Sequence, residues 1–167
     1  MTSPRPRTLR VAALTTGLAV AGLVLAGCSA TNPMTTEDQY SASDGVRVTL
    51  GDVRVSNLLV LSAAEGDVGS AQGGLINESN EDRSVTLAVG DEETTVELGP
   101  NETVLLGTGR ESEDGFAEVT FPAVDVPPGG LVEVTVSTPE AGSIVVEVPV
   151  LDGTLPEYAS AVPTASS

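Results

Sequence analysis

Cys28, the only cysteine of the chain, is the residue whose position points most directly to chemistry. It follows Leu25, Ala26 and Gly27 at the end of an apolar run that begins at Val11, and three arginines precede that run. A basic start, an apolar segment of about 15 residues and small residues at its end are typical of a cleaved secretory signal peptide. A membrane-spanning helix is less well supported, because it needs about 20 apolar residues.

The tetrapeptide from Leu25 to Cys28 resembles the lipobox of bacterial lipoproteins. This resemblance implies diacylglyceryl transfer to the Cys28 sulfur, cleavage after Gly27 and a mature N-terminus that carries acyl chains such as palmitate. A secreted protein with a chance cysteine is the alternative. We therefore expect a lipid-anchored protein on the extracytoplasmic face of the cell membrane.

Acidic side chains dominate the part of the chain that follows Gly27. All 24 aspartates and glutamates lie there with four of the seven arginines and no lysine, so its formal charge is −20. Such a surface repels the phosphates of nucleic acids and the headgroups of anionic lipids. We expect no nucleic-acid partner, and we expect attachment to the membrane to come from acyl chains, two of which anchor a protein stably.

Several catalytic residue types are missing. The chain contains no histidine, and no cysteine or lysine follows Cys28. Histidine-dependent triads, imidazole zinc sites and cysteine or lysine nucleophiles are therefore excluded. Carboxylates remain, in three clusters: Glu78, Glu81 and Asp82; Asp91, Glu92 and Glu93; Glu111, Glu113 and Asp114. Acids on such polar turns are usually solvated, whereas general acid catalysis needs a carboxyl in a sheltered cleft. We expect neither an enzyme nor a cofactor.

The acidic stretch 77–82, with the sequence NESNED, is rich in oxygen ligands for calcium or magnesium. It lacks the spacing and the glycine of an EF-hand loop, so a weak site there is only an alternative. Asn77 and Asn101 also begin sequences that match the N-glycosylation pattern. We interpret both asparagines as turn residues.

Short runs of alternating apolar and polar residues, separated by turn residues, fill the chain from residue 46 to residue 150. The part after Gly27 holds 21 valines but only four aromatic residues, a composition that suits pleated sheets. None of its segments keeps a helical period over three turns. Eight or nine short strands in about 110 residues predict an all-β domain, arranged as a two-sheet Greek-key sandwich.

The expected organisation has four parts. Residues 1–27 are the signal peptide, and residues 28–41 are polar and aperiodic, as in a flexible tether. The sandwich domain is expected over residues 42–152. Residues 153–167 end in EYASAVPTASS and are expected to form a loose tail.

Asn57 interrupts the apolar alternation at Val53 and Val55, and the four-residue apolar run Leu58–Leu61 follows it. Such a run indicates a central strand covered on both faces, or a bulge that shifts the phase of the strand. Asn57 itself is interpreted as a buried amide that pins a bulge, with a ligand-binding role as the alternative.

The segments 40–46 (YSASDGV) and 51–60 (GDVRVSNLLV) resemble the opening of the actinobacterial LpqE-like lipoproteins. The stretches 127–130 (PPGG) and 141–150 fit the same pattern, so the resemblance spans roughly residues 40–151. That family is similar to a distant branch of the periplasmic copper chaperones called PCuAC. The resemblance implies a cupredoxin-like sandwich, which agrees with the cupredoxin- or immunoglobulin-like architecture expected above.

The chain departs from the copper chaperones in its ligands. Those proteins hold Cu(I) through histidines and methionines, whereas Met34 is the only methionine after Gly27 and histidine is absent. No copper ligand can therefore be assigned to any position. The resulting hypothesis is a non-enzymatic lipoprotein whose domain binds an envelope protein or glycan through a sheet edge or through glycine-containing loops. The alternative is a metal-binding protein that uses oxygen ligands for calcium or magnesium.

Overall fold

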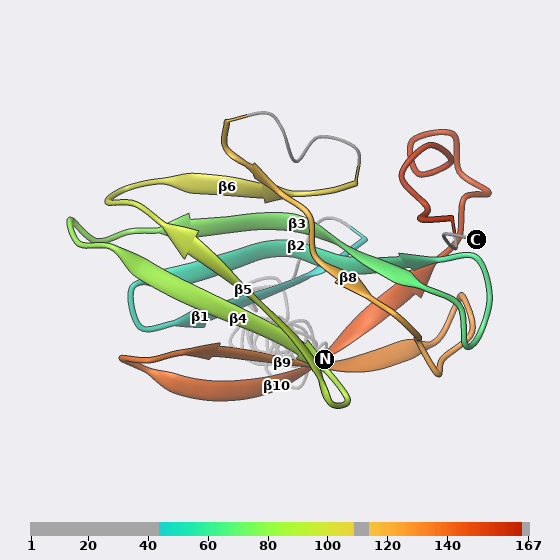
Figure 1. Ribbon diagram of the computed structural model, residues 1–167, viewed down its shortest axis with the longest axis horizontal. Coiled ribbons are helices and arrows are strands. Elements are labelled where there is room, and N and C mark those ends of the chain that lie inside the picture. Colours follow the sequence, from blue (N-terminus) through green and yellow to red (C-terminus); the bar gives the residue numbers. More distant parts are fainter. Residues whose placement is uncertain (1–43, 109–113, 165–167) are drawn as a thin grey trace, which may run out of the picture. The chain divides into compact units, whose positions relative to one another are not determined.

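Strands make up the regular structure of the described part of the chain, which in the computed structural model comprises residues 44–108 and 114–164 (Figure 1). Ten strands are found there: β1 (Val46–Leu50), β2 (Val53–Ser62), β3 (Gly69–Asn77), β4 (Arg83–Val89), β5 (Glu92–Leu98), β6 (Thr103–Leu106), β7 (Phe116–Ala117), β8 (Thr120–Phe121), β9 (Leu131–Thr138) and β10 (Gly142–Leu151). The all-β prediction is confirmed. Across these residues no helix is long and apolar enough to cross a membrane.

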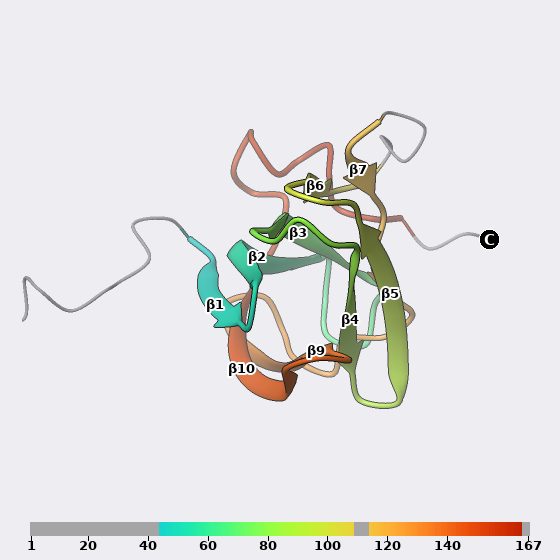
Figure 2. The same cartoon turned by 90° about the vertical axis from the view of Figure 1, so that its left-hand side faces the viewer.

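The strands follow one hydrogen-bonded path in the order β5-β4-β9-β10-β2-β3-β6-β7, to which β1 is added through β2 and β8 through β3. Neighbouring strands are antiparallel, except that β10 runs parallel to β2 and β7 runs parallel to β6. Viewed end-on, the strands surround one interior in a nearly closed, barrel-like arrangement (Figure 2). The finer prediction of a two-sheet Greek-key sandwich stays a prediction.

Valine fills this interior, as the composition suggested. The core consists of 21 buried residues, of which 14 are valine, five are leucine, and the other two are Ala71 and Phe121. Branched aliphatic side chains pack well on a pleated surface, and Phe121 is the only large ring among them. The core is therefore built almost entirely by strand residues that alternate inward.

The central strand β2 changes phase in the middle. Val53 and Val55 belong to the core, and so do Leu58 and Val60, so the inward-facing positions shift by one residue at Asn57. The pairing of β2 with β3 skips at the same place, between Ser56 and Leu59. Leu59 therefore faces away from the core although it is only 1% exposed. Both readings of the apolar run are confirmed, because β2 has a bulge and is covered on both faces.

Candidate functional site

The predicted lipidation site, Cys28, lies outside the described residues, as do the signal peptide and the tether. Asn57, by contrast, occupies the bulge of β2, with a φ of 54° that non-glycine residues rarely adopt. Its side-chain Oδ1 accepts a hydrogen bond of 2.9 Å from the backbone N–H of Gly45. The amide ties the bulge to Gly45, but it is half-buried rather than buried, so only the pinning part of the prediction agrees with the structure.

Three segments of backbone approach one another closely around Asn57. A Cβ atom placed on Gly45 would lie 2.5 Å from the Asn57 carbonyl carbon, and one placed on Gly73 would lie 2.9 Å from the carbonyl oxygens of Ser56 and Asn57. Gly73 also has a φ of 142°, which favours glycine. Conformational strain of this kind in a central strand often marks a functional site.

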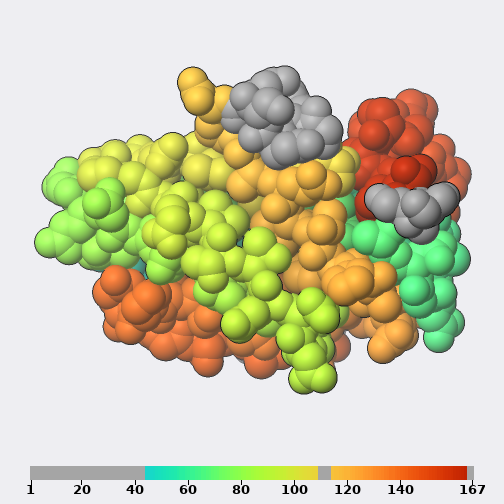
Figure 3. All heavy atoms as spheres, in the orientation of Figure 1, coloured from blue at the N-terminus to red at the C-terminus, as the bar shows by residue number. Residues whose placement is uncertain are grey.

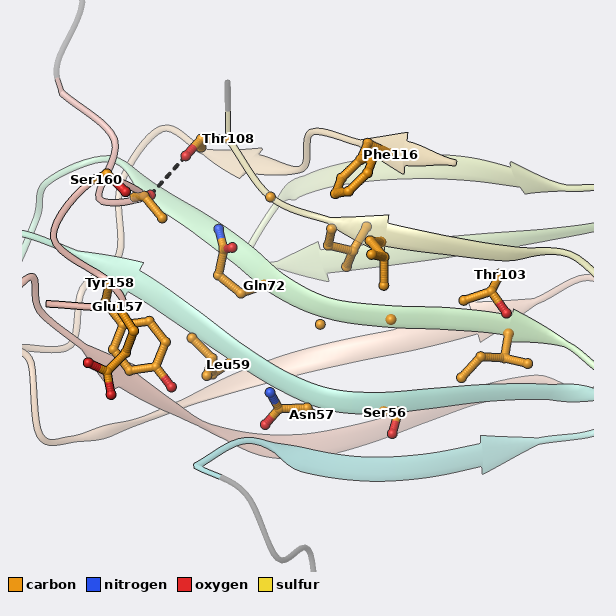
Figure 4. A pocket seen from close by; sticks show the side chains of 17 residues that line it. Ser56, Asn57, Leu59, Gln72, Thr103, Thr108, Phe116, Glu157, Tyr158 and Ser160 are labelled. Atoms are coloured by element: carbon orange, nitrogen blue, oxygen red, sulfur yellow. Dashed lines mark hydrogen bonds between the residues drawn. The ribbon is translucent and has the colours of Figure 1, made fainter. Parts of the chain in front are cut away.

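An open groove of about 610 Å³ crosses the face of β2, β3 and β6 that points away from the core, directly over this strained region (Figure 4). Gly73 and Gly74 form part of its floor together with Leu59. A Cβ atom on Gly74 would meet only the Leu105 Cδ2 atom, at 3.6 Å, so the groove owes much of its depth there to a missing side chain. Its size falls in the range of about 300–1,000 Å³ that is usual for small-molecule sites.

The C-terminal segment 155–161, here called the strap, forms one wall of the groove. The strap is a compact turn in which the backbone N–H groups of Tyr158 and Ala159 donate to the carbonyl of Leu155. Two side-chain hydrogen bonds join it to the domain: Thr108 Oγ1 donates to the carbonyl of Ala161 at 2.9 Å, and Tyr158 Oη donates to Asp44 Oδ2 at 2.7 Å. In the space-filling view the strap projects from one end of the domain (Figure 3). The expected loose tail therefore includes a segment with defined contacts.

Electrostatics at the strap are set by Tyr158 and Asp44. The hydrogen bond to the Asp44 carboxylate, with a smaller effect of burial, raises the pKa of Tyr158 to about 12. The phenol is thus fully protonated at neutral pH, and it serves as a donor rather than as a proton-transfer group. Near the start of the strap, the Thr154 backbone N–H donates to Asp152 Oδ1 and lowers the pKa of that carboxyl.

Two side-chain amides in the groove keep hydrogen-bonding capacity that residues 44–108 and 114–164 do not use. Asn57 Nδ2 makes no hydrogen bond to another described residue, since only its Oδ1 is engaged. Gln72 donates through Nε2 to Ser70 Oγ at 3.0 Å, while its Oε1 accepts nothing from the described residues. Both side chains are half-buried. The groove therefore offers a free donor on β2 and a free acceptor on β3 (Figure 4).

The acidic clusters are exposed, and several of their members form ion pairs. Glu78 lies 2.8 Å from Arg54, and Arg83 lies 3.0 Å from Glu81 and 3.2 Å from Asp52. The hydrogen bonds that Arg83 donates to Asp52 and Glu81 raise the pKa of Arg83, which is charged at every accessible pH. Within residues 44–108 and 114–164, no three histidine, cysteine or acidic side chains are grouped so that they could hold a metal ion. Glu111 and Glu113 lie outside the described residues.

Asn77 corrects the interpretation of both sequons as turn residues. Asn101 does lie in a turn, with a φ of 54°. Asn77, however, ends β3 and is 1% exposed. Its Nδ2 donates to the carbonyls of Glu81, Leu98 and Gly99 at 2.7, 3.4 and 2.8 Å, and its Oδ1 accepts from the N–H and the hydroxyl of Ser79 at 3.0 and 2.8 Å. The side chain holds two loops on the end of the strand, which local sequence does not reveal.

Sequence reasoning singled out Asn57 and glycine-containing loops, but it missed the groove and the strap. Two features of the sequence could have indicated the groove. Leu59 is an apolar residue on the outward face of a strand, where another segment must shield it from water, and Gly73 and Gly74 are consecutive glycines within a strand. Tyr158 was a third signal, as the only aromatic residue of a polar tail. None of these features specifies that the strap packs beside β2 and β3.

No family model matches the chain, and no curated protein matches it. Similar solved structures include three PCuAC domains, each covered over 98% of its length: the apo PCuAC domain from PmoF1 (19% identity over 63% of this chain, TM-score 0.49), the copper-bound PCuAC domain from PmoF2 (16%, 64%, 0.47) and the apo PmoF2 PCuAC domain (13%, 66%, 0.51). At such low identity the last of these shows the fold alone. The described domain thus has a PCuAC-like fold, as the family resemblance implied.

Proposed function

We propose that this chain is an LpqE-like lipoprotein of the cell envelope, held on the extracytoplasmic face of the membrane by acyl chains on Cys28. Its domain, taken as a Greek-key sandwich of the cupredoxin type, acts as a non-enzymatic binding or adaptor module. The observation that carries this proposal is the groove over β2, β3 and β6, whose glycine floor and unused amide groups can receive a ligand.

The ionisable groups of the groove favour binding over catalysis. Glu157 and Tyr158 are the only ionisable side chains among the described lining residues. The Tyr158 phenol has its pKa raised to about 12, far from the neutral range in which a general acid or base works best. A described lining with one carboxylate and one phenol that stays protonated suits a site that holds its ligand without converting it.

Copper carriage is not part of the proposal, although one of the similar structures is described as copper-bound. Copper(I) prefers thioether, thiolate and imidazole ligands. This chain has no histidine, its single cysteine is the proposed acylation site, and its two methionines, Met1 and Met34, precede the domain. The residues present do not fit the copper chemistry of the similar fold.

The anchor and the groove lie near each other along the chain. Asp44 follows Cys28 by 16 positions and accepts the hydrogen bond from Tyr158 in the strap. A flexible tether of that length has a root-mean-square span of roughly 20–24 Å. We therefore expect the groove to work close to the membrane surface.

Metabolic labelling with a palmitate analogue tests the anchor. The wild-type chain and a matched Ser29→Ala variant should become labelled and should fractionate with membranes, whereas Cys28→Ala should do neither. Equal labelling of Cys28→Ala would remove the anchor from the proposal.

Site-specific photo-crosslinking in intact cells tests the groove. A photoreactive residue at Thr103, an exposed lining residue on β6, should give a discrete adduct with an envelope component. The same residue at Ser143, exposed on β10 and outside the groove, should not. Absence of any adduct at Thr103 would contradict a binding role for the groove, and micromolar calcium binding by the purified chain would favour the alternative with oxygen ligands.

A further inference from the structure

The lining of the groove is almost free of charge, in contrast to the rest of the protein. Among the described lining residues Glu157 carries the only charge, whereas the chain as a whole carries 24 acidic residues and a formal charge of −17. An anionic ligand would be repelled by the surrounding field, and a cationic ligand would find a single carboxylate to pair with. The described lining therefore disfavours an anionic ligand, and apart from Glu157 it offers only uncharged groups for contact.

Hydrogen-bonding groups on the groove are of mixed type and come from neighbouring strands. Asn57 Nδ2 is a free donor and Gln72 Oε1 is a free acceptor, and Ser56 and Thr103 add hydroxyl groups that can both donate and accept. A ligand with adjacent hydroxyl groups needs donors and acceptors side by side, since each hydroxyl does both. Side-chain amides and hydroxyls meet that need without charge.

Apolar surface lies between these polar groups. The ring of Tyr158 and the side chain of Leu59 line the groove (Figure 4), and so do Phe116 and Leu105, which are register partners on β7 and β6. Aromatic rings offer broad apolar faces at a small cost in side-chain entropy. The C–H faces of a sugar ring are apolar, while its rim carries hydroxyl groups, so one sugar ring can satisfy both kinds of surface.

The floor of the groove is a sheet face rather than a sheet edge. β3 is paired with β2 on one side and with β6 and β8 on the other. The backbone groups of β3 are thus engaged in these ladders, whereas strand addition by a peptide requires an unpaired edge. A ligand in the groove meets side chains and glycine Cα atoms instead.

We propose that the groove binds an uncharged oligosaccharide, a proposal that rests on the binding role given above and names its ligand class. A lipid-linked sugar chain and a wall polysaccharide share this chemistry, and both are within reach of a membrane-anchored domain. Gly74 provides the sharpest test. A larger side chain there enters the groove with only Leu105 close by, and valine is well suited to a strand.

The binding experiment uses the purified full chain in detergent micelles, with short neutral oligomers of mannose, arabinose, galactose and N-acetylglucosamine as probes. A heparin oligosaccharide and a capped Val-Thr repeat peptide are the charged and the strand-forming controls. Backbone-amide NMR shifts should move at Gln72, Gly73 and Gly74 with at least one neutral sugar. Gly74→Val and Gln72→Leu should weaken that binding by about tenfold or more, and Ser143→Val should not change it. Thermal unfolding should show that Gly74→Val is folded.

The results can refute the sugar as the ligand without refuting the proposal that the groove binds an envelope component. No response to any neutral sugar, an unchanged response in folded Gly74→Val, or binding of heparin or the peptide at the same amides would overturn the sugar assignment. A protein captured at Thr103 in cells would overturn it as well, while leaving the anchored binding role in place. If a glycan is captured, extraction of the adduct into butanol identifies a lipid-linked source, and retention with the wall fraction identifies a polysaccharide.

Discussion

Two asparagines of this protein use their side chains in opposite ways. Asn77 is 1% exposed and uses both ends of its amide in five hydrogen bonds to neighbouring loops. Asn57 is half-buried, makes one hydrogen bond through Oδ1 to Gly45 and leaves Nδ2 facing the groove. Both amides are attached to strands of the same sheet path. The two asparagines differ in how many of their amide donor and acceptor sites are occupied by hydrogen bonds within the domain.

This contrast separates a structural polar group from a functional one. A buried amide whose donors and acceptors are all satisfied rigidifies the fold and has nothing left for a ligand. The Asn57 amide is different: its oxygen is held by a hydrogen bond at the bulge, while its N–H group can still donate to a ligand in the groove. The predictions below test each side of this comparison.

The largest effect is expected from Asn77→Ala. Loss of five hydrogen bonds leaves buried carbonyl groups without partners, which should lower the free energy of unfolding by roughly 3–5 kcal/mol, at about 1 kcal/mol for each bond. Urea denaturation measures this loss. Asn80→Ala in the same loop is the matched control and should cost about 1 kcal/mol or less, because Asn80 is exposed and accepts one exposed hydrogen bond, from Asn101. Equal stability of the two variants would contradict the structural role of Asn77.

Truncation after Thr154, which removes the strap and the residues that follow it, should have the next largest effect. Leu59 would become exposed, and uncovering one leucine side chain costs about 2 kcal/mol. Glu157→Ala keeps the strap and alters an exposed side chain, so it should change stability little. A double-mutant cycle sharpens the test, because Leu59→Ala should cost less in the truncated chain than in the full chain. Additive effects would show that the strap does not cover Leu59.

The bulge is tested by two substitutions of Asn57. Glycine accepts a φ of 54° without strain, whereas alanine does not, and both remove the hydrogen bond to Gly45. We expect Asn57→Ala to unfold at lower urea concentration than Asn57→Gly, with a difference of about 1–2 kcal/mol. Equal stabilities would mean that the backbone relaxes at this position and that the bulge is not strained.

The smallest effect is a pH dependence at the strap. The folded-state pKa of Tyr158 is raised to about 12, above the ordinary value of about 10, because the protonated phenol donates to Asp44. Its contribution to stability is therefore fully present below pH of about 10 and is lost as the pH rises through 12. Stability measured against pH should fall over that window in the wild type by more than in Tyr158→Phe. Identical alkaline profiles would show that the hydrogen bond is not formed in solution.

Local patterns of sequence predicted much of the fold. The alternation of valines predicted an all-β domain, and the interrupted phase at Asn57 predicted a bulge in a doubly covered strand. Both predictions depend on residues that are neighbours in sequence. The parallel pairing of β10 with β2 was not predicted, because it joins Val150 and Leu151 to Val60 and Leu61, and nothing in either segment specifies the other.

The groove and the strap could not be predicted from local sequence patterns. Its depth depends on the register that places Gly74 opposite Leu105, which is a property of strand pairing rather than of composition. The strap appeared as a polar tail without periodicity. Its two anchoring hydrogen bonds join residues 114 and 53 positions apart in sequence, Tyr158 with Asp44 and Thr108 with Ala161. The lipid anchor, in contrast, was inferred from a contiguous motif alone and stays a prediction.

The place of β10 in the sheet has a consequence for how the polypeptide acquires its fold. This strand pairs with both β9 and β2, so it joins β5, β4 and β9 to the other strands around the valine interior, and it is the last of the described strands in chain order. Contacts that span most of a chain form slowly, because a long loop must close before they are gained. A partly synthesised polypeptide therefore lacks the piece that closes its interior.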